Sequence, residues 1–161
     1  MVDGHVTGAD HLPPDEESER DNWTRLFRTR ERLLHAELTS ALHNDGQGEP
    51  VRFASWNART ELAQRLAEAH ASRTTAEALR DAWHAPDVPA PARPLLRDLY
   101  RLHCLEQTAP HTGWYLAHGL LTPQQVLALP ERINEICRHL VPHAEALTEL
   151  MDIPTEFLTV R

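Results

Sequence analysis

Apolar residues recur along this chain at three- and four-residue steps, the spacing of one face of an α-helix. A first helix is predicted after residue 20, and Gly46 is a natural left-handed stop for it. A second is predicted over about residues 55–83, where many alanines favour helix formation. The inner positions are Trp23, Leu26, Phe27, Leu33, Leu34, Leu38, Ala41 and Leu42 in the first helix, and Leu62, Leu66, Ala69, His70, Leu79 and Ala82 in the second.

Prolines divide the second half of the chain. Residues 85–94 contain four prolines and are predicted to form a stiff extended connector, because proline fits neither a helix interior nor a central strand. Pro94 suits the first turn of a third helix, which Pro110 should break or kink. Pro130 and Pro142 interrupt the last long apolar pattern, which should form either a bent helix or two to three pieces. The apolar positions here are Leu95, Leu96, Leu99, Tyr100, Leu102, Leu105, Leu129, Ile133, Ile136, Cys137, Leu140, Ala144, Leu147 and Met151.

The run from Gly113 to Pro123 predicts a fixed helix–corner–helix. It places Trp114, Tyr115 and His118 close together on a short helix that Gly119 should end. Thr122 and Gln125 then have the spacing of a capping box for the next helix. Trp114 and Tyr115 are interpreted as anchors of the corner, and His118 as structural. Since no hairpin signal or alternating strand pattern occurs, we predict an all-α bundle of about five helices.

Length and composition indicate one helical domain over residues 21–161, after a disordered acidic leader at 1–20. The formal net charge of -8 argues against binding to nucleic acids or to an anionic membrane surface. No apolar stretch is long enough to span a bilayer, and no secretory signal follows Met1. Cys104 and Cys137 lack metal-type spacing and are interpreted as reduced, buried thiols of a cytoplasmic protein.

The motifs of common catalytic and metal centres are missing. Eleven histidines invite a metal hypothesis, and His139 and His143 are four residues apart. A di-iron bundle needs Glu-x-x-His on two helices, however, and Pro142 disturbs the geometry between these two histidines. The sequence also lacks a nucleophile elbow and a glycine-rich phosphate loop. We therefore predict no catalytic residue, no metal and no cofactor held by this chain.

A cluster of arginines and four tryptophans remain as candidate contact residues. Arg25, Arg28, Arg30 and Arg32 could meet a cofactor phosphate or an acidic partner, although a solvated helix face is the preferred interpretation. Most of the tryptophans should be core residues, while one or two could lie on a partner surface. The candidate partner-interface residues are Trp114, Tyr115, His118, Arg25 and Arg28.

Three segments carry a resemblance to a known family. The first is Ala67-Glu68-Ala69-His70, on the helix that begins with Trp56-Asn57. The second is Leu99-Tyr100-Arg101-Leu102, which leads through Leu105-Glu106 to the run from Gly113 to Gly119. The third is Ile133-Asn134-Glu135-Ile136-Cys137, followed by Leu140, Pro142-His143-Ala144 and the run from Ile153 to Leu158. In order and spacing, residues 23–158 resemble the C-terminal all-helical domain of acyl-CoA oxidases. Departures at Leu62, where the family often has histidine, and at Pro110 and Pro130 indicate a divergent member.

This resemblance implies a role in the oxidation of acyl-CoA thioesters, with FAD as cofactor and O₂ as electron acceptor. In the family, the flavin, the acyl-CoA and the catalytic glutamate belong to preceding domains, so no catalytic residue is carried over to this chain. We expect a non-catalytic helical subunit of a split acyl-CoA oxidase- or dehydrogenase-like flavoenzyme, in fatty-acid breakdown or a specialised biosynthesis. It would dock on a flavoprotein that holds FAD, or self-associate. The alternatives are a helical binding or adaptor module and, last, an enzyme in its own right.

Overall fold

The computed structural model describes residues 16–45, 57 and 59–150, which form helices and turns without any strand. This confirms the predicted all-α class. The α-helices are α1 (Glu16–Asp45), α3 (Thr60–His84), α4 (Arg93–Thr108), α5 (Thr112–Ala117), α6 (Pro123–Leu140) and α7 (Ala144–Leu150), and the 3₁₀ turns are η1 (Ala109–His111) and η2 (Val141–His143).

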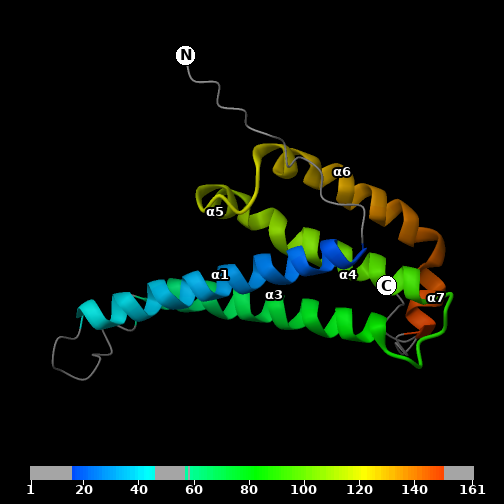
Figure 1. Ribbon diagram of the computed structural model, residues 1–161, viewed down its shortest axis with the longest axis horizontal. Helices are drawn as coiled ribbons and strands as arrows, with labels where there is room; N and C mark the ends of the chain where they lie inside the picture. The colour runs from blue at the N-terminus through cyan, green and yellow to red at the C-terminus, as the bar shows by residue number, and fades with distance from the viewer. Residues whose placement is uncertain (1–15, 46–56, 58, 151–161) are drawn as a thin grey trace, which may run out of the picture.

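The four long helices pack in chain order, each against the next. α1 contacts α3, α3 contacts α4, and α4 contacts α6. Successive long helices run in opposite directions, and α5 and α7 lie at opposite ends of the molecule (Figure 1). The outer ends of α1 and α3 project beyond α5 as a two-helix arm (Figure 1). The bundle is therefore thick where α4 and α6 cover the α1–α3 pair and thin along the arm.

The hydrophobic core joins all four long helices and the short α5. Trp83 of α3 packs on Tyr100 of α4 with ring centroids 6.2 Å apart, and Trp23 packs near Phe27 within α1 at 6.4 Å. Each such large side chain contributes about 1.5–3 kcal/mol when fully buried. The core residues are Trp23, Leu26, Phe27, Ala76, Trp83, Tyr100, Cys104, Leu105, Tyr115, Leu129, Ile136, Leu140 and Leu147.

The start of the first helix differs from the prediction. α1 begins at Glu16, five residues before the predicted start of the domain at residue 21. Residues 1–15, the predicted stop at Gly46 and the first residues of the predicted second helix, 55 and 56, lie outside the described residues.

The prolines had different effects from those predicted. Pro94 lies in the first turn of α4, and Pro110 falls in η1, both as expected. Residues 85–92 form hydrogen-bonded turns, Val88 N to Ala85 O and Ala92 N to Pro89 O, so the extended connector was wrong. Pro142 separates α6 from α7, but α6 continues through Pro130. Leu129 and Ile136, on either side of Pro130, are both buried in the core, and α6 packs against α4.

Candidate functional site

The corner after α5 is fixed by a network of backbone hydrogen bonds. Gly119 adopts a left-handed conformation with φ 63, which favours glycine. The Gly119 N–H donates to the Leu116 carbonyl at 3.0 Å and the Leu120 N–H to the Tyr115 carbonyl at 2.9 Å. This pairing is a Schellman motif and ends the helix as predicted.

The next helix starts with the predicted capping box. The Thr122 hydroxyl accepts a hydrogen bond from Gln125 N at 3.2 Å, and the Gln125 side-chain oxygen accepts one from Thr122 N at 2.8 Å. Pro123 follows directly at the first helical position. Backbone groups at the end of α5 and at the start of α6 form hydrogen bonds with neighbouring residues of the corner itself. The corner is therefore a defined scaffold for the side chains that it exposes.

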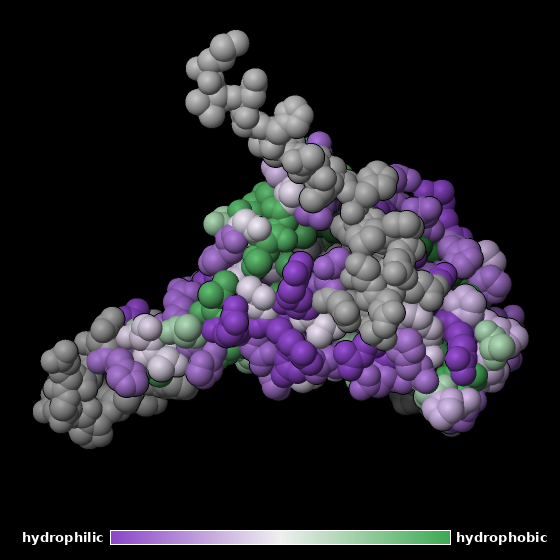
Figure 2. All heavy atoms as spheres, in the orientation of Figure 1, coloured by the Kyte–Doolittle hydropathy of each residue, from purple (hydrophilic) through white to green (hydrophobic). Residues whose placement is uncertain are grey.

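The exposed side chains around this corner are aromatic and aliphatic. His118 stacks on the half-buried Trp114 with centroids 3.9 Å apart, and its Nδ1 lies 2.8 Å from the Trp114 carbonyl oxygen. Leu116 is 37% exposed, and Leu127 of α6 is 80% exposed. Hydrophobic residues gather near α5 on the face drawn in Figure 2. We call Trp114, Leu116, His118 and Leu127 the corner surface.

Tyr115, a predicted partner-interface residue, contributes nothing to that surface. Its side chain is fully buried, and its ring packs edge-on against Trp114 at 5.3 Å. Burial raises the pKa of Tyr115 to about 12. Tyr115 is an anchor of the corner, as the sequence also indicated, and its side chain is not exposed on the corner surface.

The predicted arginine cluster divides between two faces of α1. Arg30 is only 3% exposed and donates to Glu68 at 3.2 Å, so the solvated-face interpretation is wrong for it. Arg25, Arg28 and Arg32 are exposed and lie at positions i, i+3 and i+7. Arg25 donates to Asn22 at 3.3 Å, whereas Arg28 donates to Glu77 of α3 at 2.8 Å.

The pair of Arg28 and Glu77 belongs to an ionic network, missed by sequence reasoning, that joins α1 to α3. Glu31 accepts hydrogen bonds from Arg73 and lies 2.7 Å from His70 Nδ1, and Arg73 also pairs with Glu77 at 2.6 Å. The hydrogen bond from Arg73 holds the pKa of Glu31 below its ordinary value. Helical spacing could suggest which of these residues share a face, but the pairing of the two helices sets the partners.

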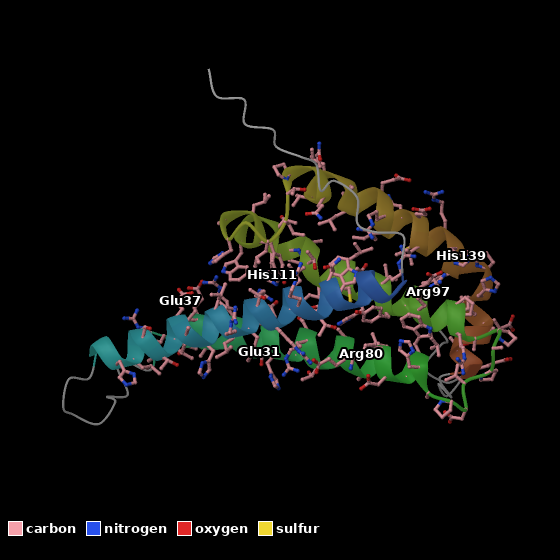
Figure 3. All side chains as sticks on the ribbon, in the orientation of Figure 1. Glu31, Glu37, Arg80, Arg97, His111 and His139 are labelled. Carbon is pink, nitrogen blue, oxygen red and sulfur yellow. The ribbon has the colours of Figure 1, made fainter. Side chains whose placement is uncertain are left out.

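Glu68, within one of the segments that carry the family resemblance, links three elements. Its Oε2 contacts buried Arg30 of α1 and also lies 3.4 Å from His111 Nε2 of η1. Burial lowers the pKa of His111, which favours the neutral imidazole. These contacts tie the α5 end of the bundle to α1 and α3, and Figure 3 shows His111 at this junction. Glu68 is therefore placed as a structural residue.

A buried carboxylate lies between α4 and α6. Asp98 is 4% exposed and lies 2.6 Å from His139 Nδ1, with Arg101 at 3.5 Å and Arg97 at 3.8 Å. Figure 3 shows Arg97 and His139 together, well away from His111. Such a group could serve acid–base chemistry or packing, and its position on the α4–α6 contact favours packing. The His139–His143 rings lie 6.1 Å apart.

No flavin site is shown among the described residues. Gly113 and Gly119 have open space where a Cβ would stand. In the same part of the chain, no group of three or more histidine, cysteine or acidic side chains could hold a metal ion. No helix there has both the length and the apolar character needed to cross a membrane.

Comparison with known proteins identifies the family. The searches of curated proteins and of solved structures found no match. A family model described as acyl-CoA oxidase matches residues 19–159, nearly the whole 161-residue chain. The match covers every long helix, the corner and the segments on which the resemblance rested, and the chain therefore belongs to the acyl-CoA oxidase family, as its C-terminal helical domain.

Proposed function

We propose that this chain is a non-catalytic helical component of an acyl-CoA oxidase- or dehydrogenase-like flavoenzyme. It docks on a flavoprotein partner and stabilises the partner's FAD- and acyl-CoA-binding body. The family match over residues 19–159 carries this proposal, because it assigns nearly the whole chain to the helical domain. FAD and the redox chemistry are assigned to the partner, because in the family the flavin belongs to domains that precede the helical domain.

The corner surface is the part of this chain that supports docking. Leu116 exposes an aliphatic side chain on the corner that carries the half-buried Trp114, and Leu127 exposes one on the helix that follows; hydrogen bonds hold the corner in place. Exposed apolar side chains on a rigid scaffold are typical of interaction surfaces, and tryptophan is enriched at their centres. Docking would bury these side chains without reorganising the helices that carry them.

Co-expression with an acyl-CoA oxidase- or dehydrogenase-like flavoprotein encoded by a neighbouring gene tests the proposal. We expect a stable complex in size-exclusion chromatography with light scattering, and higher flavin content and acyl-CoA oxidation than for the flavoprotein alone. Leu127→Glu should weaken the complex by at least ~10-fold, because it places a charge at the centre of an apolar contact. Val141→Glu is the matched control: Val141 is 71% exposed but lies beyond the other end of α6.

Two results would overturn the proposal. The first is a flavoprotein that is equally active and flavin-loaded alone and forms no complex with this chain. The second is a complex that Leu127→Glu and Val141→Glu weaken equally, which would move the contact away from the corner surface. Uptake of an acyl chain by this protein, without any flavoprotein, would instead favour the binding-module alternative.

A further inference from the structure

A long groove of about 670 Å³ runs between α1 and α3, on elements that do not form the corner surface. Leu38, Ala63, Leu66 and Ala67 provide its apolar part. Along its sides lie Arg28, Glu31, Arg32 and His35 of α1 and His70 of α3. Figure 3 labels Glu31, which lies where α1 and α3 run side by side. The feature combines an apolar floor with mostly cationic or titratable edges.

The lining residues repeat with helical spacing on both walls. On α1 they run from Arg28 to Leu38 at three- and four-residue steps, and on α3 they run from Ala63 to His70 in the same way. Two antiparallel helices with such a seam form a channel about three turns long, into which the side chains of a third helix can insert. The small side chains of Ala63 and Ala67 permit close approach of that helix. An open channel of this shape fits a helix better than it fits a compact small molecule.

The charges of the groove select the chemistry of the occupant. Arg25, Arg28 and Arg32 are exposed and form one stripe along α1. Together with two threonines, they also line a neighbouring hollow. Glu31, the only carboxylate among the described groove residues, accepts hydrogen bonds from Arg73 and contacts His70, so its charge is compensated. Arg28 is likewise paired with Glu77 of α3 at 2.8 Å, so the stripe would meet a partner mainly through Arg25 and Arg32. A local basic stripe in a chain of net charge -8 favours an acidic partner surface.

We infer that the α1–α3 groove binds an amphipathic helix of a partner protein whose apolar face is flanked by acidic residues. The apolar face lies on Leu38, Ala63, Leu66 and Ala67, and the acidic flank faces Arg32. Binding adds a third helix against the exposed side of the α1–α3 pair. This site is separate from the corner surface proposed to dock on a flavoprotein. The test of one proposal can therefore fail while the test of the other succeeds.

Two synthetic helical peptides of about 18 residues, long enough to form helix on a surface, test the inference. Both carry the same leucine face, and their flanks consist of glutamate in one and lysine in the other. Fluorescence anisotropy with the full chain should show at least ~10-fold tighter binding of the glutamate peptide, and the preference should shrink in ~0.5 M salt. Ala67→Trp, which fills the groove, should weaken that binding at least ~10-fold, and Arg32→Glu ~3- to 10-fold.

Matched variants outside the groove serve as controls. Ala78→Trp adds the same side chain at an exposed position of α3, and Arg138→Glu reverses an exposed charge of α6, and neither should alter binding. Equal binding of the two peptides, no effect of Ala67→Trp, or no binding of the glutamate peptide up to ~1 mM would overturn the inference. Dimerisation of the chain that Ala67→Trp abolishes would also overturn it, by assigning the groove to a second copy.

Discussion

Tyr115 combines complete burial with an unsatisfied hydroxyl. The Tyr115 Oη has no hydrogen-bond partner among the described residues, although Arg30 and Glu68 lie close enough to influence the pKa of the phenol. An unpaired buried hydroxyl costs free energy, because it has given up its bonds to water. The ring of Tyr115 therefore stabilises the corner, and its oxygen does not.

We expect Tyr115→Phe to leave the free energy of unfolding unchanged or to raise it by about 1 kcal/mol. Tyr115→Ala should lower it by about 3–5 kcal/mol, since the ring leaves a cavity in the core. Urea denaturation followed by circular dichroism measures both values. A loss of more than about 1 kcal/mol in Tyr115→Phe would mean that the hydroxyl has a partner, and would contradict this account.

For single residues of α1, the sequence identified the cluster of arginines but not which of their side chains point outward. Four arginines within eight residues read as one exposed cluster, yet Arg30 points inward to Glu68, whereas Arg25, Arg28 and Arg32 point outward. Local spacing places Arg30 on a different face from the other three, but only the packing of α3 and α5 against that face shows that it is buried. The Schellman corner at Gly119 was predictable because its hydrogen bonds are local.

Between elements, the contact of α1 with α3 depends on ionised side chains as well as on apolar ones. Arg73 lowers the pKa of Glu31 in the folded protein. At a pH near or below the ordinary pKa of glutamate, the unfolded chain therefore binds more protons than the folded one. The stabilisation by Glu31 is therefore present above about pH 4.5 and is lost as pH falls through the lower, folded-state pKa. The protein should lose stability in acid partly for this reason.

Glu31→Gln should reduce the unfolding free energy by about 1 kcal/mol at pH 7, and by less as the pH falls towards 3. Thermal or urea unfolding of both proteins between pH 7 and pH 3 gives this difference. Glu131→Gln is the control, because Glu131 forms an exposed pair with Arg138 on α6. A difference that stays constant across the pH range would show that the Glu31 charge does not contribute to the α1–α3 contact.

The prolines show how far elements could be predicted from sequence. Pro94, Pro110 and Pro142 each lie at a helix end or in a 3₁₀ turn, where a ring without an N–H costs little. Pro130 has the same chemistry, yet α6 passes through it. The difference lies in tertiary packing, because Leu129 and Ile136 are both buried and keep the two halves of α6 on the core. The expected effect of a proline on its own helix, judged from the neighbouring sequence, does not include this packing.

In the molecule as a whole, burial is concentrated where α4, α5 and α6 cover the α1–α3 pair. Leu34 of α1 and Thr108 of α4 are completely buried, whereas no side chain is buried at residues 39–43 or 60–68 among those described. Figure 1 shows the end of α1 and the start of α3 in the arm that projects beyond α5. Few buried contacts mean a low free energy of local opening, so the arm should open more readily than the rest of the bundle.

Amide hydrogen exchange should reveal this difference within one helix. Amides of α1 near Leu34 should exchange at least ~10-fold more slowly than those near Leu42, a contrast beyond what fraying of the last turn produces. The end of α4 at Thr108 is the control, since α5 covers it and its amides should stay protected. Uniform protection along α1 would contradict the division of the molecule into a well-packed bundle and an arm that opens more readily. If an acidic helix occupies the α1–α3 groove, adding the glutamate peptide should slow exchange in the parts of α1 and α3 that line the groove and leave α6 unchanged, because the third helix supplies new contacts there.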